Sequence, residues 1–253
     1  METLKQTSDA LGKDVTPVRG GLNQTLWQAQ QALGLVPRYF SAAGQDMLVD
    51  QHVFVEKRGG VFLDIGCADG ALGSNTLFLE VFRGWNGLLI DARAAAVVAA
   101  RDCRRAPVVQ AVIGHSGQEA EFLEATGNLQ QMSGLSATLN EAKRDILHNS
   151  EDVTLTTSTV RCVSINDILA EHGIGAIDFV SLDIEGGELD VLREFDFKAH
   201  PVRAWAIENS QHGDELQKFM SDKGYALVDY LGEDEIYVDP ETQTALVERM
   251  NEG

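Results

Sequence analysis

The segment 61–76, VFLDIGCADGALGSNT, combines an acid with glycines at a spacing that suits ligand binding. Asp64 ends an apolar run, and Gly66 and Gly70 follow it before a helix-like stretch. A glycine turn between a strand and a helix lets the backbone approach a ligand closely, and the helix N-terminus offers unpaired amide groups. The Gly-x-Gly-x-x-Gly pattern of dinucleotide sites is absent. A carboxylate at position 64 would repel a pyrophosphate, so the segment favours a cationic ligand that carries an amino group.

A second acid, Asp91, ends the apolar run GLLID. An acid at the end of the second strand of such a fold accepts hydrogen bonds from the ribose hydroxyls of an adenosine ligand. An NAD-dependent dehydrogenase is the competing interpretation, since Gly66, Gly70 and Gly73 also make a loose glycine turn. That class needs a Tyr-x-x-x-Lys pair, and none of the four tyrosines has a lysine four residues further on.

Further acids follow two later strand-like runs, AIDFVSLDI and RAWAIEN. The first run leads into Asp183, Glu185 and Glu188, and the second ends in Glu208 and Asn209. Carboxyl ends of parallel strands meet at one edge of a sheet, so these groups should lie near the ligand. We expect Asp183 first and Glu185 second to act in catalysis, whereas Glu188 complements the N-terminus of the next helix.

Two chemistries are open for this group. In one, Asp183, Glu208 and Asn209 hold Mg²⁺, whose role is to lower the pKa of a substrate hydroxyl. In the other no metal is used: Asp183 or His212 is the general base, and Glu208 and Asn209 orient the substrate. His212 follows in the loop SQHGDEL, where a solvent-exposed structural role is the alternative.

The elements that must position these residues alternate between strand-like and helical runs. We expect strands at 61–65, 87–91, 107–113, 153–165, 176–184, 203–209, 225–231 and 235–238. We expect helices at 74–83, 94–101, 166–173, 188–195 and 215–224. Strands separated by helices indicate an α/β fold with a mostly parallel sheet covered on both faces, and the last two strands predict an antiparallel hairpin.

The domain organisation is simple. Residues 1–40 are expected to be an N-terminal extension with a helix near 22–36 that Pro37 ends. Residues 41–253 then form one domain. The glycine-punctuated stretch 114–150 is expected to be a lid or substrate insert, because inserts at the carboxyl edge carry specificity.

The composition restricts the partners. The 253-residue chain has a net charge of −19, which disfavours nucleic acid as a substrate. No apolar run reaches the roughly 18 residues that span a membrane, and the N-terminus lacks the apolar core of a secretory signal. Three scattered cysteines indicate neither a disulfide framework nor a zinc site. We expect a cytoplasmic protein that acts on a small molecule, and a homo-oligomer is compatible with the sequence.

Several pieces together resemble the FkbM family of S-adenosylmethionine-dependent methyltransferases, over about residues 40–238. They are SAAGQD (41–46), FVEKRGGVFLDIGCADG (54–70), SNTLFLE (74–80), GWNGLLID (84–91), FVSLDIEGGELDVLREFDF (179–197), ENS (208–210) and DEIYV (234–238). Two departures are visible: Asp91-Ala92 stands where the family usually has Glu-Pro, and Cys67 replaces a commoner alanine. A shorter carboxylate at position 91 can still reach a ribose.

The resemblance implies a class I methyltransferase (Rossmann-like) fold, with seven strands in the order 3-2-1-4-5-7-6 and strand 7 antiparallel. It also implies S-adenosylmethionine as the cofactor, with Gln45 and Asp46 folding over it or, alternatively, packing as a capped loop on the first strand. Together with Asp91, the expected cofactor-binding residues are Gln45, Asp46, Asp64, Gly66, Asp69, Gly70, Ser74, Asn75 and Asp183.

The expected reaction is an in-line methyl transfer to a hydroxyl of a sugar or secondary metabolite. Methylation of an amine or a carboxyl group is an alternative, because acids at 183 and 185 would serve an amine equally well. A non-catalytic S-adenosylmethionine-binding protein is the alternative from another functional class.

Overall fold

The computed structural model describes residues 15–36, 38–211 and 213–252, and side chains are described as far as residue 249. Residues 1–14 and two residues of the sequence predictions lie outside this part. These two are Pro37, which was expected to end a helix, and His212, an expected general base.

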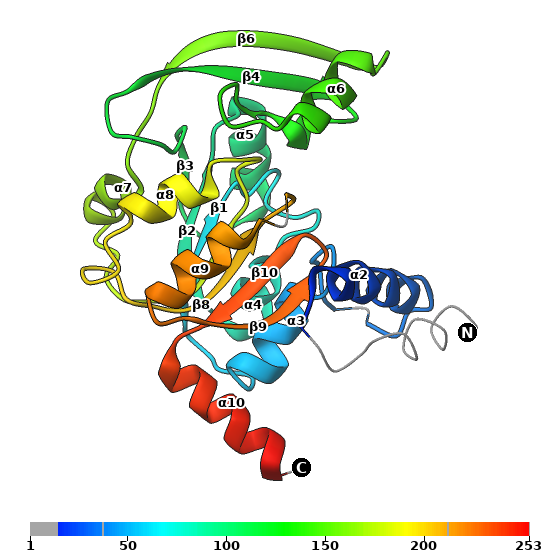
Figure 1. The fold of residues 1–253 in the computed structure, drawn as a ribbon, viewed down its shortest axis with the longest axis vertical. Coiled ribbons are helices and arrows are strands. Elements are labelled where there is room, and N and C mark those ends of the chain that lie inside the picture. The colour runs from blue at the N-terminus through cyan, green and yellow to red at the C-terminus, as the bar shows by residue number, and fades with distance from the viewer. Residues whose placement is uncertain (1–14, 37, 212, 253) are drawn as a thin grey trace.

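The described residues form a main sheet with strands in the order β3-β2-β1-β7-β8-β10-β9 (Figure 1). Its strands are β1 (Val61–Ile65), β2 (Asn86–Asp91), β3 (Val108–Gln110), β7 (Ile177–Leu182), β8 (Val202–Glu208), β9 (Ala226–Leu231) and β10 (Asp234–Val238). Strand β10 is antiparallel to both neighbours, and the other pairs are parallel. Counted along the chain within this sheet alone, the order is 3-2-1-4-5-7-6, which confirms the predicted fold class.

Helices cover both faces of this sheet because its central strands are apolar on both sides. Leu63 and Ile65 of β1 pack in a core with α7 (Ile165–Glu171), α8 (Glu188–Glu194) and α9 (Asp214–Asp222). Phe62 points to the opposite core, with α3 (Gln45–Leu48), the π-helical turn Val49–Val53, α4 (Leu77–Arg83) and α5 (Ala94–Cys103). Alternate β1 side chains therefore serve different cores.

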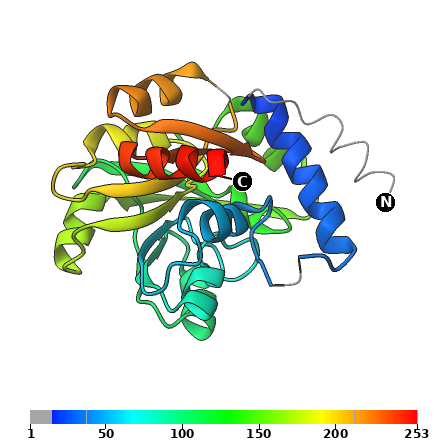
Figure 2. The ribbon, with the colours of Figure 1, turned by 90° about the horizontal axis from the view of Figure 1, so that it is seen from below.

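Helix α2 (Pro17–Ala32) lies along the β9 edge of the sheet, where Figure 2 shows it beside the orange strands. The Asn23 side chain donates to the Tyr230 carbonyl at 2.7 Å, and the buried Trp27 indole donates to the Ser41 carbonyl at 2.8 Å. The helix begins earlier than predicted because Pro17 suits the first helical turn. At the other end of the chain, α10 (Pro240–Glu252) follows β10.

Residues 119–161 form a separate layer, here called the insert, above the main sheet (Figure 1). Strand β4 (Glu119–Gly127) pairs with both β5 (Gly134–Leu135) and β6 (Val153–Arg161). The insert also holds the 3₁₀ turn Gln130–Met132 and α6 (Glu141–Asn149). The expected lid at 114–150 is thus more regular than its sequence indicated, and it is longer. Strand β6 joins it because its Thr-rich, mostly exposed side chains could not enter a buried parallel sheet.

Candidate functional site

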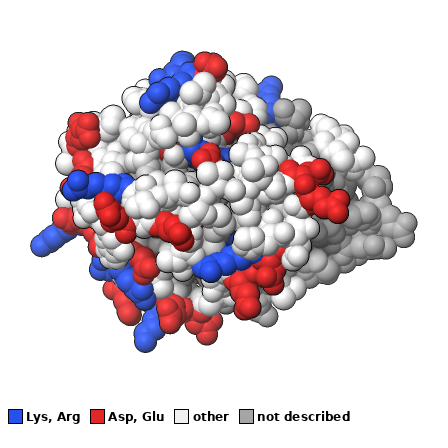
Figure 3. All heavy atoms as spheres, turned by 90° about the horizontal axis from the view of Figure 1, so that it is seen from above, with Lys and Arg blue, Asp and Glu red and all other residues white. Residues whose placement is uncertain are grey.

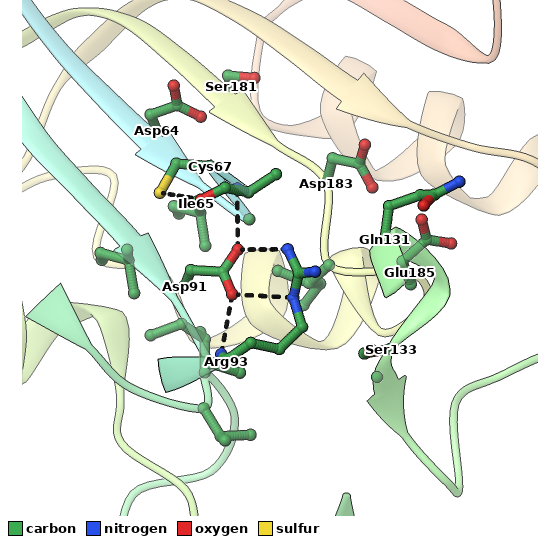
Figure 4. Close-up of a pocket in the computed structure, with 18 of the residues that line it drawn as sticks. Asp64, Ile65, Cys67, Asp91, Arg93, Gln131, Ser133, Ser181, Asp183 and Glu185 are labelled. Atoms are coloured by element: carbon green, nitrogen blue, oxygen red, sulfur yellow. Dashed lines mark hydrogen bonds and ion pairs between the residues drawn. The ribbon is translucent and has the colours of Figure 1, made fainter. Parts of the chain in front are cut away.

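A cavity of about 310 Å³ lies at the carboxyl ends of β1, β2 and β7, beneath the insert (Figure 4). The sheet contributes the turn after Asp64, the β2 end at Asp91 and the β7 end at Asp183. The insert contributes Phe122 and Ser133 among other residues. The three segments that the sequence singled out around positions 64, 91 and 183 therefore meet in one place.

The turn after β1 approaches its neighbours too closely for a larger residue at Gly66. Gly66 has φ +85°, and a Cβ added there would lie 1.6 Å from the Asp183 carbonyl oxygen. Two residues later, Ala68 also has a positive φ of 49° and directs its N–H to Asp91 Oδ2 at 2.9 Å. The left-handed backbone thus builds a tight turn that joins the ends of β1, β2 and β7.

Both carboxylate oxygens of Asp91 are engaged by the protein. Oδ1 accepts from the Arg93 backbone N–H at 2.8 Å, and the Arg93 guanidinium bonds to both oxygens at 3.2 and 3.3 Å (Figure 4). Arg93 also donates to the Gln130 carbonyl of the insert at 3.0 Å. A ribose at Asp91 would therefore share this carboxylate with Arg93, a residue that the sequence analysis missed although it lies two positions away.

Asp64 lines the cavity, but its carboxylate also interacts with other side chains of the protein. It accepts from the Thr76 hydroxyl at 2.5 Å, and the Arg104 guanidinium lies 3.9 Å away. Arg104 is completely buried and donates to Glu80 at 2.6 Å and to the Gly70 carbonyl at 2.9 Å. Burial raises the pKa of Asp64, and the charge of Arg104 opposes that rise. No local pattern pointed to Arg104, because its partners lie 24 or more positions away.

The residues around the start of α4 divide into two groups. Ser74 and Asn75 line the cavity. The Asn75 amide nitrogen donates to the Ser181 hydroxyl at 3.0 Å, whereas its buried amide oxygen has no hydrogen-bond partner among the described residues. Asp69 accepts from two backbone N–H groups of its own turn, and Gly70 packs against α5. Asp69 and Gly70 shape the loop without lining the cavity.

The structure places Gln45 and Asp46 behind the cavity wall. Gln45 donates to the Leu231 carbonyl at 3.2 Å and to Asp234 at 3.0 Å. Asp46 accepts from the Ser41 hydroxyl at 2.5 Å and from the Phe40 N–H at 2.7 Å. Burial raises the pKa of Asp46 to about 6, although these hydrogen bonds oppose the rise. In this arrangement Gln45 joins the segment that precedes β1 to β9 and β10, and Asp46 fixes the turn of that segment.

The acids after β7 have distinct environments. Asp183 lines the cavity and is an exposed residue, and Figure 4 shows it on the same side of the cavity as Glu185. Burial raises the pKa of Asp183 well above its ordinary value, and the Glu208 and Glu185 carboxylates add to this rise. Glu185 adopts a left-handed φ of 63° at the turn. Glu188 accepts from the Ile184 and Gly186 N–H groups at 3.0 Å each, so it closes the turn before α8.

A second cavity of about 490 Å³ lies between the insert, α8 and the loop after β8, and it shares Glu185 and Gly186 with the first. Its described lining residues include five acids and no lysine or arginine. The acids are Glu185, Glu188, Asp190, Glu208 and Glu215. Thr138, Asn140, Asn209, Ser210 and Gln211 add hydroxyl and amide groups. The shared turn at Glu185 therefore separates two compartments.

The expected metal-binding set converges only in part. One oxygen each of Asp183, Glu188 and Glu208 can be chosen so that all lie within 4.8 Å of one another. The Asn209 amide nitrogen donates to the Gly213 carbonyl at 3.1 Å and to Glu235 at 2.8 Å, so its amide oxygen is the atom that could bind a metal. The Lys143 ammonium of the insert already contacts Glu208 at 2.6 Å. In this arrangement an ammonium group contacts Glu208, one of the three expected metal ligands, and the Mg²⁺ site stays a prediction.

Asp234 is another buried acid that the sequence analysis did not single out, and it predicts a pH dependence of stability. Burial raises its pKa from 3.8 to about 7, although Gln45 and Asn75 donate to it. A raised acid pKa stabilises the fold fully below about pH 4, and this contribution is lost as the pH rises through 7. Between pH 4 and 8 the free energy of unfolding of the wild type should therefore fall by about 4 kcal/mol because of Asp234. Asp234→Asn, which cannot ionise at this position, should not show this fall.

Urea unfolding of the wild type and Asp234→Asn at several pH values measures this difference. Asp229→Asn is a control, because Asp229 lies on β9 in a partly exposed ion pair with Arg19. Parallel pH profiles for the wild type and Asp234→Asn would contradict the prediction.

None of the helices in the described part of the chain is both long and apolar enough to cross a membrane. On the face that Figure 3 shows, lysine and arginine side chains are interspersed with aspartate and glutamate. Within the residues drawn in colour, this face has no continuous basic surface.

Comparisons with solved structures give matches at low sequence identity. A methyltransferase FkbM from Methylobacillus flagellatus KT is 12% identical, with a TM-score of 0.45 over 94% of this chain and 58% of that chain. A TehB-like SAM-dependent methyltransferase from Corynebacterium glutamicum ATCC 13032 is 14% identical, with a TM-score of 0.39 over 88% and 100%. A SAM-dependent methyltransferase from Aquifex aeolicus is 13% identical, with a TM-score of 0.35 over 79% and 97%. This chain spans 58% of the first of these structures. No curated protein matches it.

The family comparison covers the part of the chain that builds the first cavity. The model of the methyltransferase FkbM domain matches residues 64–227, from the end of β1 to β9. This range is more than half of the 253 residues and includes the cavity-lining acids at 64, 91 and 183. The chain therefore belongs to the methyltransferase FkbM domain family.

Proposed function

We propose that this protein is an S-adenosylmethionine-dependent methyltransferase that methylates a hydroxyl group of a sugar or secondary metabolite. The observation that carries the proposal is the meeting of two cavities at Glu185 and Gly186, with Asp183 beside them in the first. One cavity suits the methyl donor and the other the acceptor. Because both cavities border on this turn, an acceptor held in the second could reach past the turn toward a donor in the first, as an in-line transfer requires.

The residues of the first cavity fit the cofactor. The turn after β1 brings the backbone close to a ligand, and Asp91 offers a carboxylate for ribose hydroxyls. The unpaired amide oxygen of Asn75 is an acceptor that suits the amino group of the donor. Asp64 and Asp183 supply negative charge near a sulfonium. When bound, S-adenosylmethionine supplies the methyl group and a good leaving group.

Asp183 is the proposed general base. Its carboxylate has no hydrogen-bond partner among the described residues, and burial, together with the neighbouring acids, raises its pKa. A higher pKa makes a carboxylate a better proton acceptor for an acceptor hydroxyl. Glu185, at the shared turn, would orient the acceptor, and His212 remains the alternative base from the sequence.

The charge of the second cavity supports the proposed class of acceptor. Carboxylates line it together with amide and hydroxyl groups, which are the usual partners of sugar hydroxyls. A phosphorylated or carboxylated acceptor would be repelled. An amine acceptor is the second candidate, because the same carboxylates favour a cation. The overall charge of −19 supports the proposal of a small-molecule substrate rather than nucleic acid, and we also propose a cytoplasmic location.

Cofactor binding is the first test of this function. S-adenosylhomocysteine should bind the purified protein, and Asp91→Ala should lower its affinity about 10- to 100-fold because two ribose hydrogen bonds to a charged group are lost. Calorimetry measures both affinities. Asp178→Ala, which removes an acid at the opposite end of β7, is the matched control. Binding of NAD in place of S-adenosylhomocysteine would overturn the proposal in favour of a dehydrogenase.

The second test concerns Asp183. Once an acceptor is found by screening neutral and amino sugars, Asp183→Asn should lower kcat by about 100- to 10,000-fold, as expected for loss of a general base. S-adenosylhomocysteine binding should change much less, which shows that the fold is intact. Unchanged turnover in this variant would assign the base elsewhere. Cofactor binding without methyl transfer to any screened acceptor would favour the non-catalytic binding protein.

A further inference from the structure

One lysine of the insert reaches the boundary between the two cavities. Lys143 lies in the first turn of α6, and its ammonium contacts Glu185 after β7 and Glu208 at the end of β8. The distance to Glu208 Oε1 is 2.6 Å. The side chain of Lys143 is only 12% exposed, and those of Glu185 and Glu208 are 14% and 7% exposed. This ammonium therefore bridges two largely buried carboxylates that come from neighbouring strands.

The insert holds Lys143 in place from above. Asn140 caps α6 by accepting from the Lys143 backbone N–H at 2.7 Å. One turn further, Leu147 is buried in the small core of the insert with Leu123 and Leu139. The lysine therefore extends from a helix that is both capped and packed, and a fixed helix costs less conformational entropy for the ion pairs.

The main domain also fits closely against the insert at this point. A Cβ added at Gly186 would lie 2.6 Å from the Thr138 carbonyl oxygen, and one added at Gly187 would lie 3.2 Å from the Thr138 side chain. The turn that carries Glu185 thus approaches the loop before α6 as closely as glycines allow. These close contacts of Gly186 and Gly187 with Thr138 hold the turn of Glu185 near the helix that carries Lys143.

The charge at this point is that of a cation site. Asp183, Glu188 and Glu208 offer converging oxygens, and Glu185 adds a fourth carboxylate at Lys143. Such a group needs a positive charge, because like charges at short range destabilise one another. Among the described residues, Lys143 is the cation that contacts both Glu185 and Glu208.

We propose that Lys143 is a positioning residue whose ammonium takes the place of a divalent cation between Glu185 and Glu208. It fixes the positions of the two carboxylates at the boundary of the donor and acceptor cavities. The same ion pairs bind the insert to the main domain. The catalytic part of this inference rests on the proposed function. Its structural part concerns only the residues of this chain.

The test is divalent-cation binding, which needs neither cofactor nor acceptor. After removal of metals with EDTA, the wild type should bind Mn²⁺ weakly, as measured by calorimetry and by the paramagnetic resonance of free Mn²⁺. Lys143→Gln should bind Mn²⁺ about 100-fold more tightly, because a neighbouring positive charge is lost while the carboxylates stay. Lys143→Arg should behave as the wild type does, since it keeps the charge.

Two controls locate the effect. Lys57→Gln breaks another partly buried lysine–carboxylate pair, at 2.6 Å from Asp178, and should leave Mn²⁺ binding unchanged. Adding Glu208→Gln to Lys143→Gln should abolish the gained affinity. Equal Mn²⁺ affinities for the wild type and Lys143→Gln would overturn the proposal.

The wild type alone also tests the proposal if Lys143→Gln fails to fold. Stoichiometric binding of Mn²⁺ to the wild type at micromolar concentration would show that a metal, not the lysine, occupies this place. S-adenosylhomocysteine binding is measured separately on the same samples. A failure of cofactor binding would count against the proposed function, and only the Mn²⁺ results count against the role of Lys143.

Discussion

Gly66→Ala should destabilise the protein by about 4 kcal/mol or more and abolish S-adenosylhomocysteine binding. The new methyl group would lie 1.6 Å from the Asp183 carbonyl oxygen, where backbone meets backbone and no side chain can move aside. The left-handed conformation at φ +85° adds about 1 kcal/mol for any residue with a Cβ. The ends of β1 and β7 would have to separate, and that movement would distort the cavity between them.

Gly59→Ala is the matched control for this prediction. Gly59 also has a positive φ, of 68°, but a Cβ there meets nothing within 4 Å. The Gly59→Ala variant should therefore lose only about 1 kcal/mol of stability, which is the cost of the backbone conformation alone. Urea unfolding gives the two free energies, and calorimetry gives the affinities. Equal losses of unfolding free energy in Gly66→Ala and Gly59→Ala would contradict the prediction, because the close approach at Gly66 would then contribute nothing.

Arg104→Met should have the second large effect, a loss of about 3 to 5 kcal/mol, because it leaves buried acids without their cation. Arg104 is completely buried, donates to Glu80 at 2.6 Å, and is the positive charge nearest Asp64, at 3.9 Å. The variant should also lose stability further as the pH rises, since unpaired buried carboxylates resist ionisation. The substitution would also remove the hydrogen bond from Arg104 to the Gly70 carbonyl. The loop that shapes the first cavity should therefore become more mobile.

Two variants give this prediction its controls. Arg105 is next in sequence and also pairs with Glu80, but its side chain is 72% exposed, so Arg105→Met should cost at most about 1 kcal/mol. The double variant Arg104→Met with Glu80→Met should recover part of the loss, because an apolar pair no longer buries an unpaired charge. Denaturation measured at pH 5 and 8 tests all three variants. A similar loss for Arg104→Met and Arg105→Met would contradict the role of burial.

Some of the fold could be predicted from the sequence because it depends on local patterns. Apolar runs that end in an acid or a glycine marked the strands and their carboxyl ends, so the positions of Asp64, Asp91 and Asp183 at one edge were predictable. The exact ends of helices and strands were harder to predict. Helix α4 was expected from Ser74 but begins at Leu77, because the Ser74 hydroxyl accepts from the Leu77 N–H at 3.1 Å.

The partners of the acids could not be predicted in this way. Lys143 is 65 positions from Glu208, and no local spacing relates a lysine of the insert to the end of β8. Gln45 and Asp46 matched the family pattern, yet the structure shows side chains turned to Asp234 and Ser41 rather than to the cavity. A sequence pattern shows which residue types are present, but not which groups form hydrogen bonds or ion pairs with their side chains.

The sequence by itself indicated the family through its short motifs, and the resemblance to that family implied the order of the strands in the main sheet. Hydrophobic periodicity, which is local, indicated the edge at which the acids gather. Only the tertiary structure decided which distant cations neutralise the buried carboxylates: Arg104 pairs with Asp64, and Lys143 pairs with Glu208. A buried charge needs a partner in space, and residues distant in the chain become neighbours only when the sheet and the insert have folded.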